Sequence, residues 1–181
     1  RGAAEANRLG KPVVIDPVGL GTSPLRQETL STLLAAHHIT AIRGNISEIK
    51  ALAGLSTDAG GVDASESDLA DPAAFALAAR MARKLAAAHN TVIAISGPRD
   101  IISDGHTTYV VNGGNAMMTR VTGSGCTLTG IVAAFAAAAP EDILRAATAA
   151  IGLMCLAGDQ ALEKTGHHAT ASFHTAMFDA L

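Results

Sequence analysis

The chain contains few aromatic residues, few cysteines and no strong excess of charge of either sign. Aromatic residues make up 3% of its 181 residues, so its core must consist of closely spaced aliphatic side chains instead of a few large rings. A net charge of −3 gives no broad basic surface, which argues against nucleic acid as a partner. The two cysteines, at positions 126 and 155, are too few for a disulfide framework, and we therefore expect a reducing, cytoplasmic environment.

Long hydrophobic runs are also missing. The longest apolar stretches, such as residues 131–139, are too short and too rich in alanine to span a bilayer, so no membrane association is expected. The chain is long enough for one domain with a substantial core. Its first ten residues resemble the last turns of a helix that ends at Gly10. We therefore expect residues 1–181 to form a single domain that lacks an N-terminal part of its fold.

The distribution of apolar residues predicts alternating strands and helices. Short continuous apolar runs are typical of strands buried on both faces, and apolar residues at helical spacing predict the helices between them. The predicted strands are residues 12–16, 40–43, 92–96, 101–104, 107–111 and, after a second hairpin turn at 112–114, 116–119. The predicted helices are residues 25–37, 46–53, 72–89, 126–139, 141–164 and 172–181, with a loop at 55–71 rich in Gly, Asp and Ser. This order predicts an α/β fold with a mostly parallel sheet, an antiparallel extension and covering helices.

The most informative segment is Val121-Thr122-Gly123-Ser124-Gly125-Cys126, which leads into an apolar helix. Glycines allow unusual backbone dihedral angles, and a helix start offers unpaired N–H groups, so residues 123–126 predict an anion hole for a phosphate. Such a turn is also often only a tight connection. It is not a P-loop, because no Gly-Lys-Ser/Thr follows, and it does not fit the dinucleotide-binding pattern.

Polar residues follow the predicted strands at one edge of the sheet, where ligands of such folds bind. They are Asp16, Arg43, Asn45 and Ser96. Asp16 either forms an Asp-Pro turn or helps to hold a hydrated Mg²⁺ together with Glu48, which equally suits the start of a helix. Arg43 and Ser96 suit the phosphates of a nucleotide, although a surface arginine and a serine that only completes a strand end are the plainer alternatives.

Other reactive side chains carry less information. Cys155 lies among apolar residues of a predicted helix and is interpreted as a packing residue. The seven histidines have no spacing with cysteines or carboxylates that indicates a metal site.

Five segments together resemble one family. In order they are Val-Ile-Asp16-Pro-Val-Gly-Leu-Gly21, Ala-Ile-Arg43-Gly-Asn45-Ile-Ser-Glu48-Ile, Gly61-Val-Asp63-Ala, Val-Ile-Ala-Ile-Ser96-Gly97 and Thr-Arg-Val-Thr-Gly123-Ser-Gly125-Cys126. Over essentially the whole chain, they closely resemble hydroxyethylthiazole kinases of thiamine salvage. The resemblance implies a ribokinase-like three-layer α/β/α fold. It also implies transfer of the γ-phosphoryl group of ATP to the primary alcohol of 4-methyl-5-(2-hydroxyethyl)thiazole, with Mg²⁺ as cofactor.

The resemblance also implies a role for each site residue. Arg43 and Ser96 contact ATP, Gly123 contacts the thiazole, and Asp16 and Glu48 organise Mg²⁺. Cys126 stands where sugar kinases of the wider superfamily carry a catalytic aspartate, and we interpret it as a modest general base or as a group that orients the substrate hydroxyl. Intact members of the family form homotrimers with active sites between subunits.

Three alternatives remain. Hydroxymethylpyrimidine kinases share a Gly-x-Gly-Cys turn, although the combination of Arg43, Asn45 and Glu48 argues against them. A nucleotide-binding fragment without catalysis is a second possibility. A protein-binding scaffold is the third and weakest, because it leaves the combination of site residues to coincidence.

Overall fold

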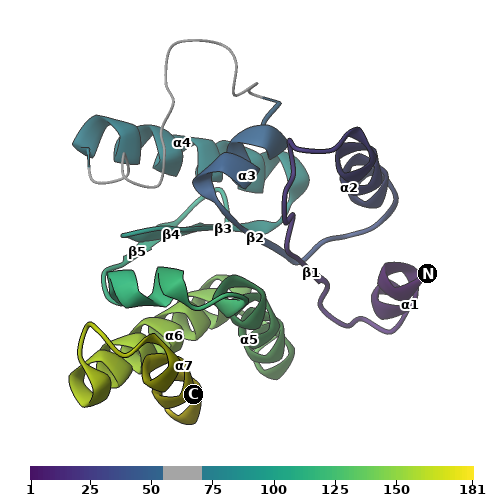
Figure 1. The fold of residues 1–181 in the computed structure, drawn as a ribbon. Coiled ribbons are helices and arrows are strands. Elements are labelled where there is room, and N and C mark those ends of the chain that lie inside the picture. Colours follow the sequence, from purple (N-terminus) through teal and green to yellow (C-terminus); the bar gives the residue numbers. More distant parts are fainter. Residues whose placement is uncertain (55–70) are drawn as a thin grey trace.

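The computed structural model describes residues 1–54 and 71–181 and contains a five-stranded sheet between two layers of helices (Figure 1). Most of the predicted loop at 55–71, including Gly61-Val-Asp63-Ala, lies outside the described residues. The strands are β1 (Val14–Ile15), β2 (Ala41–Asn45), β3 (Val92–Ser96), β4 (Asp100–Ser103) and β5 (Thr108–Val111). The helices are α1 (Gly2–Arg8), α2 (Pro24–Ala36), α3 (Ile46–Leu52), α4 (Pro72–His89), η2 (Ala116–Arg120), α5 (Ser124–Ala138), α6 (Ile143–Thr165) and α7 (Thr170–Asp179).

The strands lie in chain order across the sheet, β1-β2-β3-β4-β5. β1, β2 and β3 are parallel, whereas β4 and β5 continue the sheet as an antiparallel hairpin. Helices α3 and α4 cover one face, and α5, α6 and α7 cover the other (Figure 1). The predicted three-layer α/β/α fold with an antiparallel extension is thereby confirmed.

Two hydrophobic clusters fill the spaces on the two faces of the sheet. Successive strand residues point to opposite faces, so Ile93 and Ile95 join the cluster under α4, while Val92 and Ala94 join the cluster under α5 and α6. The second cluster contains many small residues from α6, among them Ala147, Ala150, Ala157 and Ala161. Small side chains allow α6 to approach the sheet closely, which explains how a core with so few aromatic residues is filled.

The same alternation places the polar residues at the ends of the parallel strands. Val14 pairs with Ala41, Ala41 with Val92, and Asn45 with Ser96. Asp16, Arg43 and Ser96 each lie an even number of residues after one of these positions. Because every second residue shares a face, all three are directed toward the layer of α5 and α6.

One predicted strand is wrong. Residues 116–119 belong to η2, a short 3₁₀ helix, because Asn115 caps it by accepting a hydrogen bond from the Met117 N–H. A short apolar run does not distinguish a strand from a single helical turn, and the capping asparagine decides this case. The predicted helix at 126–139 begins two residues earlier, at Ser124. None of the helices in the described part of the chain is long and apolar enough to cross a membrane.

Candidate active site

The turn before α5 has the geometry that its glycines predict. Gly123 has a φ of 86°, a left-handed conformation that favours glycine, and it is the N-cap of the helix. The Ser124 N–H donates to the Val121 carbonyl oxygen, which removes this group from the predicted anion hole. The N–H groups of Gly123, Gly125 and Cys126 have no hydrogen-bond acceptor within residues 1–54 and 71–181. Three of the four predicted donors are therefore free to bind an anion.

Arg43 lies directly beneath this turn. Its side chain is 11% exposed, and its Nη2 donates to Ser96 Oγ over 2.5 Å. A Cβ atom added to Gly125 would lie 2.8 Å from Arg43 Nη1, closer than real contacts allow. The guanidinium group therefore occupies this position only because residue 125 is a glycine. A fixed positive charge at a helix start makes the anion site stronger than the helix alone would.

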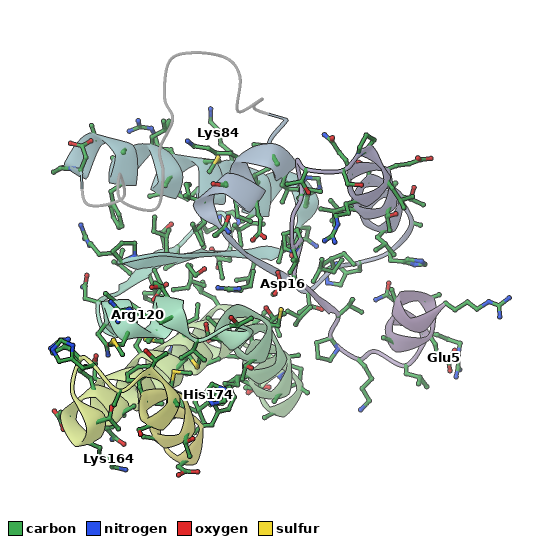
Figure 2. The ribbon with its side chains drawn as sticks, in the orientation of Figure 1. Glu5, Asp16, Lys84, Arg120, Lys164 and His174 are labelled. Atoms are coloured by element: carbon green, nitrogen blue, oxygen red, sulfur yellow. The ribbon has the colours of Figure 1, made fainter. Side chains whose placement is uncertain are left out.

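Asp16 completes this arrangement from the neighbouring strand and lies between β1 and α5 (Figure 2). Its Oδ2 accepts a hydrogen bond from Thr129 Oγ1 at 2.8 Å and lies 3.8 Å from Arg43 Nη1. Its Oδ1 is buried and has no hydrogen-bond partner within the described residues. An unpaired buried carboxylate oxygen is costly, and a divalent cation would satisfy it.

Glu48 has a structural role in addition to the predicted metal role. Its Oε2 accepts from the Asn45 N–H at 2.9 Å, while Asn45 Oδ1 accepts from the Glu48 N–H, so the two residues form a capping box at the start of α3. Its Oε1 accepts from the Gly19 N–H at 3.0 Å and holds the loop after β1. Within the described ranges no three His, Cys, Asp or Glu side chains cluster as a metal site. Mg²⁺ needs only one or two carboxylates when phosphates complete its shell, so the unpaired Oδ1 of Asp16 fits this ion. Both carboxylate oxygens of Glu48 already accept backbone N–H groups.

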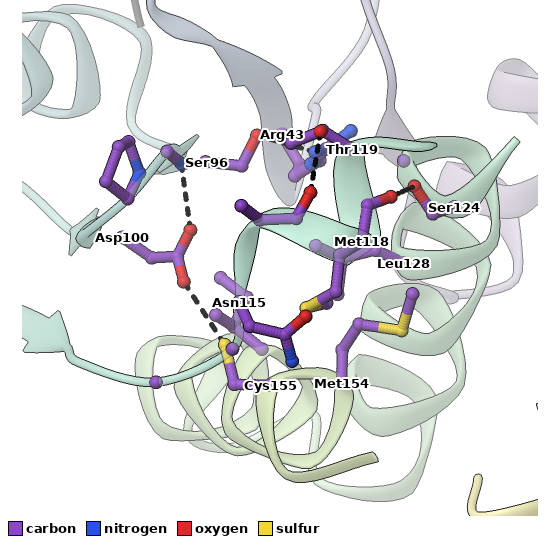
Figure 3. A pocket seen from close by; sticks show the side chains of 17 residues that line it. Arg43, Ser96, Asp100, Asn115, Met118, Thr119, Ser124, Leu128, Met154 and Cys155 are labelled. Atoms are coloured by element: carbon purple, nitrogen blue, oxygen red, sulfur yellow. Dashed lines mark hydrogen bonds between the residues drawn. The ribbon is translucent and has the colours of Figure 1, made fainter. Parts of the chain in front are cut away.

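A cavity of about 540 Å³ adjoins Arg43 and the start of α5 (Figure 3). It is lined by the ends of β2 and β3, the start of β4, residues 113–119, the first turn of α5 and the middle of α6. Arg43, Ser96, Ser124 and Gly125 line it, while Leu128, Ile151 and Met154 provide an apolar wall. Gly123 and Cys126 are exposed at the adjoining turn and are not part of this lining. A cavity with an anion site at one side and apolar residues at another suits a nucleotide.

Comparison with known proteins decides between the families that share such a site. The model of the hydroxyethylthiazole kinase family matches residues 1–181. A relative named hydroxyethylthiazole kinase from Ruminiclostridium cellulolyticum is 42% identical over 177 residues, which cover 98% of this chain and 63% of that relative. The chain belongs to the hydroxyethylthiazole kinase family. It spans less than two thirds of the length of this relative and of the hydroxyethylthiazole kinases from Clostridium beijerinckii and Clostridium botulinum that it also matches.

Solved structures agree with this assignment. The hydroxyethylthiazole kinase structure from Pyrococcus horikoshii is 31% identical and superposes with a TM-score of 0.80, covering 97% of this chain and 61% of that one. A ribokinase-like superfamily protein from Enterococcus faecalis, 20% identical, has a TM-score of 0.57 and covers 99% of this chain and 67% of that one. At that identity the second structure supports the fold alone, and it confirms the ribokinase-like architecture.

The structure adds site residues that sequence reasoning missed. Thr129 holds Asp16, and it lies one helical turn after Gly125 on the face of α5 that packs against the sheet. Asp100 lies just outside the predicted strand at 101–104 but is the first residue of β4, and it shares its face with Ile102, which packs against α6. The spacing of four residues between Gly125 and Thr129 indicates that both lie on one face of the helix, so Thr129 could have been predicted to lie near the site. For Asp100, no feature of the sequence shows where β4 begins.

Asp100 and Cys155 form a buried pair on the wall of the cavity (Figure 3). The Cys155 thiol donates to Asp100 Oδ2 at 3.5 Å, and the Gly97 N–H donates to Asp100 Oδ1 at 3.0 Å. Burial raises the pKa of Asp100, while the Gly97 N–H, the Cys155 thiol and the Arg43 charge oppose this rise. Burial and the neighbouring Asp100 raise the pKa of Cys155 to about 12. Cys155 is thus buried, as its interpretation as a packing residue requires, and it also makes a polar contact in the cavity.

We predict that Asp100→Asn removes a pH-dependent part of the stability. Because the pKa of Asp100 is raised above its ordinary value of 3.8 in the folded chain, protonation favours folding. The free energy of unfolding of the unsubstituted chain, relative to Asp100→Asn, should be highest below this value and should decline as the pH rises through the raised pKa. Urea unfolding of both chains from about pH 3.5 to about pH 7 measures the difference. A difference that stays constant over this range would contradict the assignment.

Proposed function

We propose that this chain binds ATP and transfers its γ-phosphoryl group to the primary alcohol of 4-methyl-5-(2-hydroxyethyl)thiazole, a step of thiamine biosynthesis and salvage. The observation that carries the proposal is the position of Arg43 beneath Gly125, beside free N–H groups of the α5 start and a cavity large enough for a nucleotide. Membership in the hydroxyethylthiazole kinase family supports the choice of alcohol. Phosphoryl transfer depends on such positioning and charge stabilisation more than on covalent chemistry by the protein.

The site residues divide between the two substrates. Arg43 and Ser96, which are hydrogen-bonded to each other, bind the phosphates of ATP from below the turn. The free N–H groups of Gly125 and Cys126 bind the transferred phosphoryl group and stabilise its charge as it moves. Gly123, exposed at the rim of the turn, contacts the thiazole. The two substrates therefore meet at the start of α5.

Asp16 and Glu48 are proposed as the residues that hold Mg²⁺, Asp16 through its unpaired Oδ1 and Glu48 through water. When bound, Mg²⁺ would neutralise phosphate charge. Thr129 keeps Asp16 in place by donating to its other oxygen. The Arg43 guanidinium lies 3.8 Å from the Asp16 carboxylate and keeps it close to the phosphate site.

Cys126 is proposed as the group that receives or orients the proton of the alcohol. The alcohol oxygen forms a bond to the γ-phosphorus while the bond from that phosphorus to the departing ADP oxygen breaks. The alcohol proton passes to the Cys126 sulfur, which accepts it as the thiolate, and from there to water. Cys126 is exposed at the first turn of α5, beside the N–H groups that would bind the phosphoryl group.

The remaining features of the proposal are a single domain, a homotrimer in the intact family member and a cytoplasmic location. All described strands share one sheet, which supports a single domain. The exposure of Gly123 and Cys126 is compatible with a site that a neighbouring subunit helps to close. Two free cysteines support a reducing compartment.

The proposal predicts that the chain converts hydroxyethylthiazole and Mg·ATP to thiazole phosphate, detected by mass spectrometry. Asp16→Ala should abolish the product, because within the described residues it removes the one carboxylate that has a buried, unpaired oxygen. Hydroxymethylpyrimidine serves as the control acceptor. Faster phosphorylation of hydroxymethylpyrimidine would favour the related kinases, and ATP-dependent thermal stabilisation without product would favour a non-catalytic nucleotide-binding fragment. The absence of both ATP-dependent stabilisation and product would refute the proposal altogether.

The role of Cys126 predicts a separate result. Cys126→Ala should lower kcat by about tenfold or more, because general bases commonly contribute 10²–10⁴-fold and a loose transition state uses only part of this. The KM for ATP should change little, since the Cys126 side chain is not part of the cavity lining. Cys126→Ser, which keeps a polar atom of similar size at this position, separates loss of the sulfur from loss of the whole side chain. Nearly full turnover by Cys126→Ala would show that Cys126 is not the base.

A further inference from the structure

Residues 113–118 form one wall of the cavity, and a residue outside the cavity lining holds them in place. Asp159, on α6, accepts the Gly114 N–H at 3.0 Å through Oδ2 and an Asn115 Nδ2 hydrogen at 3.2 Å through Oδ1. Asn115 Nδ2 also donates to the Gly158 carbonyl oxygen at 2.9 Å. Gly114 and Asn115 both line the cavity, whereas Asp159 does not.

The packing of this segment on α6 is as close as its hydrogen bonds indicate. A Cβ atom added to Gly158 would overlap Met118 Sδ, so Met118 rests on bare helix backbone. A Cβ atom added to Gly113 would lie 3.1 Å from the Cβ atom of Cys155. Met118 and Cys155 face the cavity together with Asn115 (Figure 3). The wall therefore has its present shape only while residues 113–118 lie flat against α6.

The start of this segment is costly to order. It begins with two consecutive glycines, which lose more conformational freedom on ordering than any other residue, and Gly114 has a φ of 74°. A carboxylate that accepts a backbone N–H and an amide hydrogen makes charge-assisted bonds, which are stronger than neutral ones. A side chain of this kind can offset the ordering cost of the glycines.

We propose that Asp159 is a positioning residue for the nucleotide site, acting through Gly114 and Asn115 to fix the wall formed by residues 113–118. The inference rests on the proposed function, because the ligand of this wall is ATP. Asp159 touches neither substrate. Its loss leaves Arg43 and the start of α5 intact but allows the wall to move, so that ATP must order the segment when it binds.

The test is isothermal titration of ATP into the unsubstituted chain and into Asp159→Ala, at a temperature where both are fully folded. Asp159→Ala should bind ATP about tenfold more weakly, a loss of about 1.4 kcal/mol. The matched control is Asp142→Ala, which removes a carboxylate from the same helix. Asp142 caps α6 by accepting the Arg145 N–H and is not part of the cavity lining, so its loss should lower stability but leave ATP affinity unchanged.

Two further variants keep the test decisive. Asn115→Ala should weaken ATP binding. In the double variant with Asp159→Ala, the fold-loss of ATP affinity should be smaller than the product of the two single fold-losses, because both substitutions break the same contact. Where Asp159→Ala does not fold, Asp159→Asn replaces it. This variant keeps the shape but turns one acceptor into a donor, and it should weaken ATP binding about threefold.

The outcomes separate this inference from the proposed function. Failure of the unsubstituted chain to bind ATP would refute the proposed function and this inference with it. Normal ATP binding by the unsubstituted chain, with an affinity of Asp159→Ala within about twofold of it, would overturn the positioning role alone. An equal loss of affinity in Asp142→Ala would overturn it too, because the effect would then follow general stability.

Discussion

The close approach of the Arg43 guanidinium to Gly125 is the constraint on which the rest of the site depends. It joins the end of a central strand to the first turn of α5, and it exists only because residue 125 has no side chain. Ser96 and Asp16 approach the same guanidinium from the neighbouring strands. A positive charge thus lies under a helix start whose N–H groups are free, and both features favour an anion at the same point.

The core explains how this contact is held. Small residues of α6 and on the facing side of the strands bring the helix layer close to the sheet, and the buried strand residues alternate strictly between two clusters. This close packing fixes the distance between the strand ends and the start of α5. The apolar wall of the cavity, formed by Leu128, Ile151 and Met154, is a continuation of the same packing.

Most of the fold and part of the site could be predicted from the sequence. Buried strands have continuous apolar runs, and Asp16, Arg43 and Ser96 follow three such runs, so their meeting at one sheet edge follows from parallel pairing. The pairing register, which places all three on one face, is a property of the folded sheet and cannot be read from the apolar runs. Long-range partners such as Thr129 for Asp16, and Asp159 for Gly114, also depend on how α5 and α6 pack. The apolar run of the short η2 helix suits a strand equally well, and the hydrogen bond that Asn115 accepts from the Met117 N–H decides for the helix.

The most direct test of this account is the ATP affinity of Gly125→Ala, with Gly130→Ala as its control. Both substitutions place the same methyl group on α5, but only the one at Gly125 meets Arg43, since nothing lies within 4 Å of the Cβ position at Gly130. Gly125→Ala should bind ATP at least about tenfold more weakly, while Gly130→Ala should bind ATP normally. Unchanged ATP affinity in Gly125→Ala would show that the position of Arg43 beneath the turn does not create the phosphate site.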